Sequence, residues 1–231
     1  MLTIGNSGTL KAIIINELMK TVKPAEAFNK SAKLYQQKFM NVSLYAEPFQ
    51  VFCDHIQVNN PSILDIACGP GNIVKYLLDR QPDYRILGID LSPNMLDLAQ
   101  INNPTAQFQL MDCREINKIE QHFNGITCGF CLPYLTPEEA AAMISDVAKL
   151  LKPAGMFYLS TMEEDANNQS RYQISSTGDR VYVHYHREDT LAQALSQSGF
   201  ETLCIKRYSA PDQNGVNISD LVLVCKLKQV I

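Results

Sequence analysis

Short apolar runs alternate with amphipathic stretches along most of the chain. The runs predict strands, and the stretches between them, whose apolar residues recur at helical spacing, predict helices. The expected strands are 62–67, 84–90, 107–111, 125–131 and 156–162, and the expected helices between them are 72–80, 93–101 and 136–151. Strands that alternate with helices in this order form a parallel, doubly wound α/β sheet.

Residues at the expected helix starts support these boundaries. Ser92 is placed to cap a helix that has Pro93 at its first position. Thr136 and Glu139 have the spacing of a capping box at the start of the long helix. After that helix, "KPAG" at 152–155 predicts a turn that leads into the fifth strand.

The two ends of the chain depart from the alternation. Residues 25–58 are predicted to be helical with a break near "NVSLYAEP", so 1–58 are expected to form an N-terminal helical cap or extension and 59–231 the main domain. Met19 is as plausible a start as Met1, and residues 1–18 are either an extension or a loosely attached helix.

The last third of the chain predicts a different arrangement. "RYQISSTGDRVYVHYH" predicts an inserted hairpin, with 170–186 as a lid, followed by a helix at 188–198. Strands at 200–208 and 219–227 are close enough to be antiparallel neighbours. The expected fold is a seven-stranded Rossmann-like sheet, mostly parallel with an antiparallel final strand.

Composition narrows the classes of partner. A formal charge of −4 and a pI near 5.6 disfavour nucleic acid as a partner. No apolar run approaches the roughly 18 residues of a membrane span, so no membrane partner is expected. The seven cysteines are an odd number without a secretory leader, which predicts a reducing, cytoplasmic location. We expect a monomer or a homodimer that acts on a small molecule.

The loop after the first strand, in "ILDIACGPGN", indicates a ligand site. Gly69 and Gly71 let a ligand approach the main chain closely, and Asp65 places an acid just before the turn. A dinucleotide motif would need a third glycine where Val74 stands, and Pro70 removes one amide donor. An acid repels a pyrophosphate but suits an ammonium group, so the loop favours a ligand that carries positive charge.

This loop resembles the first motif of the class I S-adenosylmethionine-dependent methyltransferases. The resemblance continues through "LGIDLSPNMLDLA", "QLMDCRE", "FNGITCGFCLPYLTPEEA" and "LLKPAGMFYLSTM", in order and at suitable intervals. It implies S-adenosyl-L-methionine as cofactor, with Asp90 on the ribose hydroxyls, Asp112 on the adenine amino group and the Cys113 amide on a ring nitrogen. The implied cofactor-binding residues are Tyr35, Asp65, Ala67, Cys68, Gly69, Gly71, Asn72, Asp90, Leu91, Met95, Met111, Asp112, Cys113 and Phe130.

Catalytic residues are harder to assign. His184 and His186 share one face of the hairpin, and either has the chemistry of a general base, although a half-exposed structural histidine is more common. Tyr134 belongs to "CLPY", which resembles the N-P-P-Y signature of amino-group methyltransferases but lacks its polar first residue. All three are therefore weak candidates, and methylation of adenine or glutamine nitrogens is disfavoured.

Metal and redox chemistry are not expected. Cys128 and Cys131 form a C-x-x-C, but the pair lies at the end of an apolar strand, and no second Cys/His pair stands at zinc spacing. Glu163 to Asp165 are interpreted as a solvated loop.

The sequence therefore predicts transfer of a methyl group to a small-molecule acceptor by in-line displacement, a reaction that needs mainly alignment and a dry pocket. The alternatives are a non-catalytic S-adenosylmethionine-binding regulatory or partner protein and, less favoured, a nicotinamide oxidoreductase.

Overall fold

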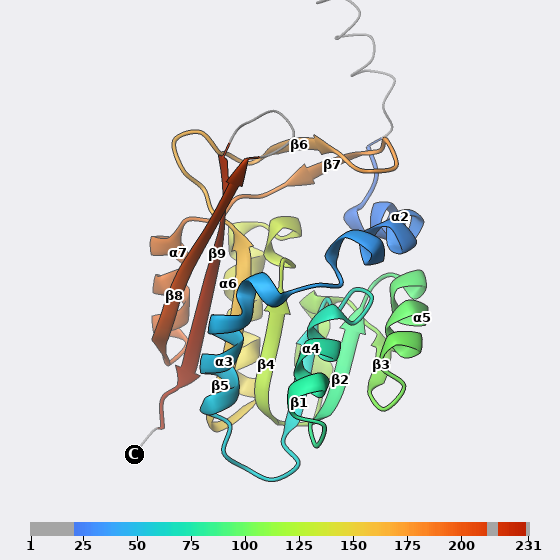
Figure 1. Cartoon of the computed structure of the whole chain (residues 1–231). Helices are drawn as coiled ribbons and strands as arrows, with labels where there is room; N and C mark the ends of the chain where they lie inside the picture. Colours follow the sequence, from blue (N-terminus) through green and yellow to red (C-terminus); the bar gives the residue numbers. More distant parts are fainter. Residues whose placement is uncertain (1–20, 212–216, 230–231) are drawn as a thin grey trace, which may run out of the picture.

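The computed structural model describes residues 21–211 and 217–229, which form a sheet with helices on both faces (Figure 1). No helix in these two ranges is both long enough and apolar enough to cross a bilayer. In chain order the elements are α2 (Pro24–Phe39), η1 (Ser43–Tyr45), α3 (Ala46–Asp54), β1 (Ser62–Ile66), α4 (Asn72–Arg80), β2 (Arg85–Asp90), α5 (Pro93–Asn102), β3 (Gln107–Leu110), η2 (Cys113–Lys118), β4 (Phe123–Gly129), η3 (Leu132–Tyr134), α6 (Pro137–Leu150), β5 (Leu151–Met162), β6 (Arg171–Ile174), β7 (Arg180–Val183), α7 (Glu188–Gln197), β8 (Phe200–Pro211) and β9 (Asn217–Leu227).

The main sheet has seven strands in the order β3-β2-β1-β4-β5-β9-β8. Strands β1 to β5 are parallel, and β9 runs antiparallel to both of its neighbours, β5 and β8. The predicted fold is confirmed, including the separate hairpin of β6 and β7. From β1 the chain adds β2 and then β3 on one side of the sheet, and it then adds β4 and β5 on the other side of β1. The strand order therefore reverses between β1 and β4, and the carboxyl ends of these two strands border the crevice where open α/β sheets bind ligands.

Two helix starts form as the sequence predicts. The Ser92 hydroxyl accepts a hydrogen bond from the Met95 amide at 3.2 Å at the start of α5. At the start of α6 the Thr136 hydroxyl accepts from the Glu139 amide at 3.2 Å, and the Glu139 carboxylate accepts from the Thr136 amide at 2.8 Å. Local chemistry therefore determines where these helices begin.

The sheet is covered on both faces, with α3, α4 and α5 on one side and α6 and α7 on the other (Figure 1). One hydrophobic core lies under α3 and α4 and contains Phe49 and Tyr158, whose rings stack at 4.4 Å. The other lies under α6 and α7 and contains Phe123 and Ile144. All five residues of β1 are buried, as expected of a central strand that is covered on both faces.

The sequence predicted a turn at 152–155 that ends before the fifth strand, and this is wrong because β5 already begins at Leu151. These residues lie inside β5, where the register with β4 shifts: Leu151 pairs with Phe123 and Met156 pairs with Gly125. Ala154 adopts a left-handed φ of 60° within this detour. The turn residues therefore form an irregularity within a longer strand, because the ladder resumes on its far side.

Helix α2 and the β6–β7 hairpin lie together beyond the carboxyl ends of the parallel strands (Figure 1). The Asn29 side-chain oxygen accepts from the Ser92 hydroxyl at 2.9 Å and from the Asn94 amide at 3.0 Å, which fixes α2 to the start of α5. Lys30 forms an ion pair with Asp179 of the hairpin at 2.9 Å. These contacts join the two segments over the crevice. The predictions about residues 1–18 lie outside the described residues.

Candidate functional site

A cavity of about 690 Å³ lies at the carboxyl ends of β1, β2 and β4. Its wall is mostly apolar and its polar groups are concentrated at the strand ends, as is usual for a small-molecule site. Most of the predicted cofactor-binding residues line it: Tyr35, Ala67, Gly69, Asp90, Leu91, Met95, Met111, Asp112, Cys113 and Phe130. The remaining four are Asp65, Cys68, Gly71 and Asn72, which contribute no lining here.

The loop after β1 adopts left-handed backbone at three positions, with φ of 55° at Ala67, 53° at Gly69 and 77° at Gly71. A Cβ at Gly71 would lie 2.3 Å from the side-chain nitrogen of Asn103, so this position requires glycine. At Gly69 the nearest atom to such a Cβ would be Tyr35 Cε1 at 3.8 Å, and the space beside it is the cavity. Ala67 has a strained conformation at the binding site that the sequence analysis did not foresee.

Asp90 joins the loop to β2. Its carboxylate accepts hydrogen bonds from the Gly69 amide at 2.9 Å and from the Ser92 amide at 2.8 Å. Burial raises the pKa of Asp90. Each carboxylate oxygen keeps a further lone pair, and the side chain lines the cavity, so Asp90 can accept from a ligand without releasing the loop.

Asp65 lies behind this wall and is fully buried. The Thr127 hydroxyl donates to its Oδ1 at 2.7 Å, while Oδ2 has no hydrogen-bond partner among the described residues. Burial raises the pKa of Asp65 to about 7, and the negative charge of Asp90 adds to the shift.

Asp90, together with Asp65 once it is ionised, creates a negative potential at the floor of the cavity. Burial and, to a smaller extent, the negative charges of Asp90 and Asp65 raise the pKa of the Tyr35 phenol to about 12. Tyr35 lines the cavity, so the same field that disfavours a tyrosinate anion would favour a cation placed there.

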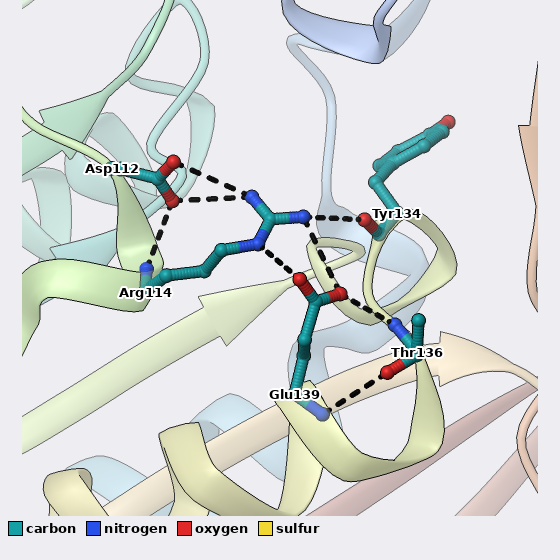
Figure 2. Close-up of polar contacts among 5 residues, drawn as sticks. All are labelled: Asp112, Arg114, Tyr134, Thr136 and Glu139. Carbon is teal, nitrogen blue, oxygen red and sulfur yellow. Dashed lines mark hydrogen bonds and ion pairs between the residues drawn. The ribbon is translucent and has the colours of Figure 1, made fainter.

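At the β3 end, Asp112 is held by an arginine that the sequence analysis did not single out. Figure 2 shows the Arg114 guanidinium between Asp112 and Glu139, at 3.2 Å and 2.6 Å. The Arg114 amide also donates to the Asp112 carboxylate at 2.9 Å, and its guanidinium donates to the Tyr134 carbonyl at 3.2 Å. The hydrogen bond that the Arg114 guanidinium donates to the Glu139 carboxylate, together with the ion pairs, raises the pKa of Arg114.

This network gives Glu139 two functions. Its carboxylate completes the capping box with Thr136 and also accepts from Arg114 (Figure 2). The sequence predicted only the first function, because the 25-residue separation between Arg114 and Glu139 is bridged by the tertiary fold. The result is a fixed orientation for the Asp112 carboxylate at the cavity wall.

A second cavity, of about 590 Å³, adjoins the first. Phe28, Tyr35, Phe130 and Tyr134 line both cavities, so their rings stand at the junction. Phe130 has a left-handed φ of 53°, and its amide donates to the Ser160 carbonyl at 3.0 Å. Of the four predicted residues that do not line the first cavity, Cys68 and Asn72 line the second.

Of the weak catalytic candidates, Tyr134 is the one at the junction. Its ring meets that of Phe28 edge-on at 5.0 Å. Neither His184 nor His186 lines either cavity. His186 is buried with Nε2 at 2.8 Å from the Leu132 carbonyl oxygen, and burial lowers its pKa. Nothing in this geometry favours a histidine as a base.

The two cysteines of the C-x-x-C have different surroundings. Cys128 is buried in β4, whereas Cys131 precedes η3 and lines the first cavity. In the part of the chain that the structure describes, no group of three or more His, Cys, Asp or Glu residues could hold a metal ion.

Comparison with known sequences identifies similar proteins. Residues 63–155 match a family model described as a methyltransferase domain. The chain is similar to an uncharacterized methyltransferase, sll0829, of Synechocystis, at 31% identity over 46% of this chain and 49% of that protein. It is also similar to a malonyl-[acyl-carrier protein] O-methyltransferase of Acetivibrio thermocellus, at 28% identity over 58% of this chain and 47% of that protein. The chain thus spans about half the length of these two curated relatives.

The fold has solved counterparts. One is the 1,6-didemethyltoxoflavin-N1-methyltransferase of Burkholderia thailandensis, whose structure contains S-adenosylhomocysteine and 1,6-didemethyltoxoflavin. The two structures align with a TM-score of 0.63 and 18% sequence identity over 99% of this chain and 93% of that one. At this identity the likeness is one of fold.

Proposed function

This chain belongs to the class I S-adenosylmethionine-dependent methyltransferases, and we propose that it transfers a methyl group from that cofactor to a small-molecule acceptor by in-line displacement. The observation that carries the proposal is the pair of cavities that meet at the strand ends of β1 and β4. One has the polar groups that an adenosyl ligand requires, and the other provides a separate space for an acceptor.

The first cavity fits the cofactor residue by residue. Asp90 would accept from the ribose hydroxyls, and Asp112, oriented by Arg114, would accept from the adenine amino group. Leu91 and Met95 line the same cavity and would flank the base. When bound, the cofactor supplies a methyl group that is already activated on a sulfonium. The protein therefore needs to align the acceptor and exclude water.

Charge distinguishes this ligand from a dinucleotide. Arg114, a cation of the cavity wall, is already paired with two carboxylates, and Asp65 adds negative charge from behind the wall when the pH is above its pKa of about 7. Lys23, the other cation among the described lining residues, is exposed. A pyrophosphate would find no buried cation here, whereas a sulfonium with an ammonium group is attracted.

The N-terminal cap and the hairpin lid form the remaining walls of the proposed site. Residues of α2 line both cavities, and hairpin residues including Gln173 and Val181 line the second. We assign the choice of acceptor to these segments, because they cover the crevice from above while the sheet forms its floor.

Calorimetry with S-adenosylhomocysteine tests the cofactor assignment. The wild type is expected to bind it in the low-micromolar range, and Asp90→Ala is expected to lose binding because the ribose contact and the anchor of Gly69 both disappear. Asp97→Asn, which removes an exposed carboxylate from the same part of the chain, is the matched control and should bind normally. Tighter binding of NADH than of S-adenosylhomocysteine would contradict the assignment.

Methyl turnover separates the enzyme from its alternative, a non-catalytic cofactor-binding regulatory or partner protein. A cavity of about 590 Å³ beside the cofactor site favours the enzyme, because a protein that only binds the cofactor needs no second space. Binding of S-adenosylhomocysteine without methyl transfer to any member of a broad acceptor panel would favour the alternative.

A further inference from the structure

The second cavity contains a carboxylate that the reaction so far has not used. Asp220, on β9, lines this cavity and lies opposite Met162 of β5 in the antiparallel ladder. It is the one acid among the described lining residues. A carboxylate in a wall that also contains several aromatic rings marks the place where a polar group of a ligand is recognised.

Tyr45 holds this carboxylate in position. Its hydroxyl donates to Asp220 Oδ2 at 2.7 Å, and it is the one hydrogen-bond partner of the Asp220 side chain among the described residues. Oδ1 is therefore free to accept from a ligand. Burial raises the pKa of Asp220, and the hydrogen bond from Tyr45 opposes that rise.

The same tyrosine connects the acid to the methyl site. The ring of Tyr45 lies against the ring of Phe130, with centroids 5.7 Å apart, and Phe130 lines both cavities. Asp220 is thus one ring removed from the junction where an acceptor would meet the cofactor.

The charge of this cavity excludes one class of acceptor. Lys38 is the one cation among its described lining residues, and its side chain is exposed. An acceptor with a carboxylate or phosphate would be placed near Asp220 without a buried counter-charge. The aromatic lining, which includes Phe49 and Tyr158, instead suits a flat ring.

We propose that the acceptor is a flat aromatic or conjugated molecule that carries no carboxylate or phosphate and whose hydroxyl or ring N–H donates to Asp220. The proposal rests on the proposed function, because it assigns the substrate class of the same site.

Binding of two matched probes tests the substrate class. Naphthol and hydroxynaphthoate share a flat ring and a hydroxyl, but the second carries a carboxylate. With the full chain saturated with S-adenosylhomocysteine, fluorescence titration of the wild type should show naphthol binding at least ten-fold tighter. Asp220→Asn keeps the shape of the site but removes its charge, and should reduce that preference to less than three-fold. Asp220→Ser is a second variant that also removes the charge, and Asp97→Asn is the control for loss of a surface acid.

Equal or tighter binding of hydroxynaphthoate to the wild type, or an unchanged preference in both Asp220 variants, would overturn the proposal. The same holds if naphthol fails to bind a protein that binds S-adenosylhomocysteine. Failure to bind S-adenosylhomocysteine itself would instead refute the proposed function.

Discussion

The buried acid behind the cofactor loop provides a quantitative test of the electrostatic reasoning. Burial raises the pKa of Asp65 from its ordinary value of 3.8 to about 7, so the folded protein holds a proton that the unfolded chain has already lost. The penalty is absent below pH 3.8, grows as the pH rises from about 4 to 7 and is constant above 7. Its full size is about 4 kcal/mol, from (7 − 3.8) units at 1.36 kcal/mol each, with no discount for solvent because Asp65 is fully buried.

Asp65→Asn removes this penalty. The amide cannot ionise, and its oxygen can still accept from the Thr127 hydroxyl, but its nitrogen would face the position where Oδ2 now has no partner. An unsatisfied donor there costs roughly 1–3 kcal/mol at every pH. At pH 4 the variant should therefore be less stable than the wild type, and at pH 8 it should be more stable.

Urea unfolding of the ligand-free wild type and variant, measured from pH 4 to pH 8, checks this prediction. The difference in unfolding free energy, variant minus wild type, should rise by about 4 kcal/mol over this range. Asp97→Asn controls for the loss of one formal charge. A difference that does not change with pH would refute the reasoning, because it would mean that Asp65 is not held neutral by burial. Asp65→Asn should also weaken S-adenosylhomocysteine binding at pH 8, where the lost field would have attracted the ammonium group.

Four further substitutions test separate parts of the site. Gly71→Ala should destabilise the protein by roughly 2 kcal/mol or more in thermal or urea unfolding, because its Cβ would overlap a side-chain nitrogen at 2.3 Å. Gly69→Ala should cost only about 1 kcal/mol of backbone strain but weaken S-adenosylhomocysteine binding; equal stability losses at the two glycines would contradict this. Calorimetry should show that Arg114→Met lowers the ratio of affinities for S-adenosylhomocysteine and its inosine analogue about ten-fold, because Asp112 is no longer oriented. Arg114→Lys should retain part of this preference. Asn29→Ala should weaken S-adenosylhomocysteine binding several-fold by loosening α2, whereas the exposed Gln37→Ala should not; equal affinities would place α2 outside the cofactor site.

Much of the fold follows from local signals. The Ser92 and Thr136 caps and the apolar runs predict the helix starts and strand positions because they act within a few residues. The start of the fifth strand was predicted wrongly because β4 pairs with the chain on both sides of residues 152–155, which keeps them within one strand. A local pattern does not reveal such a partner.

The sequence by itself determined the elements, the sheet class and the loop that favours a positively charged ligand, because each is encoded by neighbouring residues. Only the tertiary structure decided the second cavity. Its acid, Asp220, accepts a hydrogen bond from Tyr45, which lies 175 residues away in the sequence. Arg114 likewise donates to Glu139 across 25 residues of sequence. In the proposed function the cofactor is bound by a loop next to one strand, whereas the acceptor is bound by side chains from distant segments. Their encounter depends on packing, which no short stretch of sequence encodes.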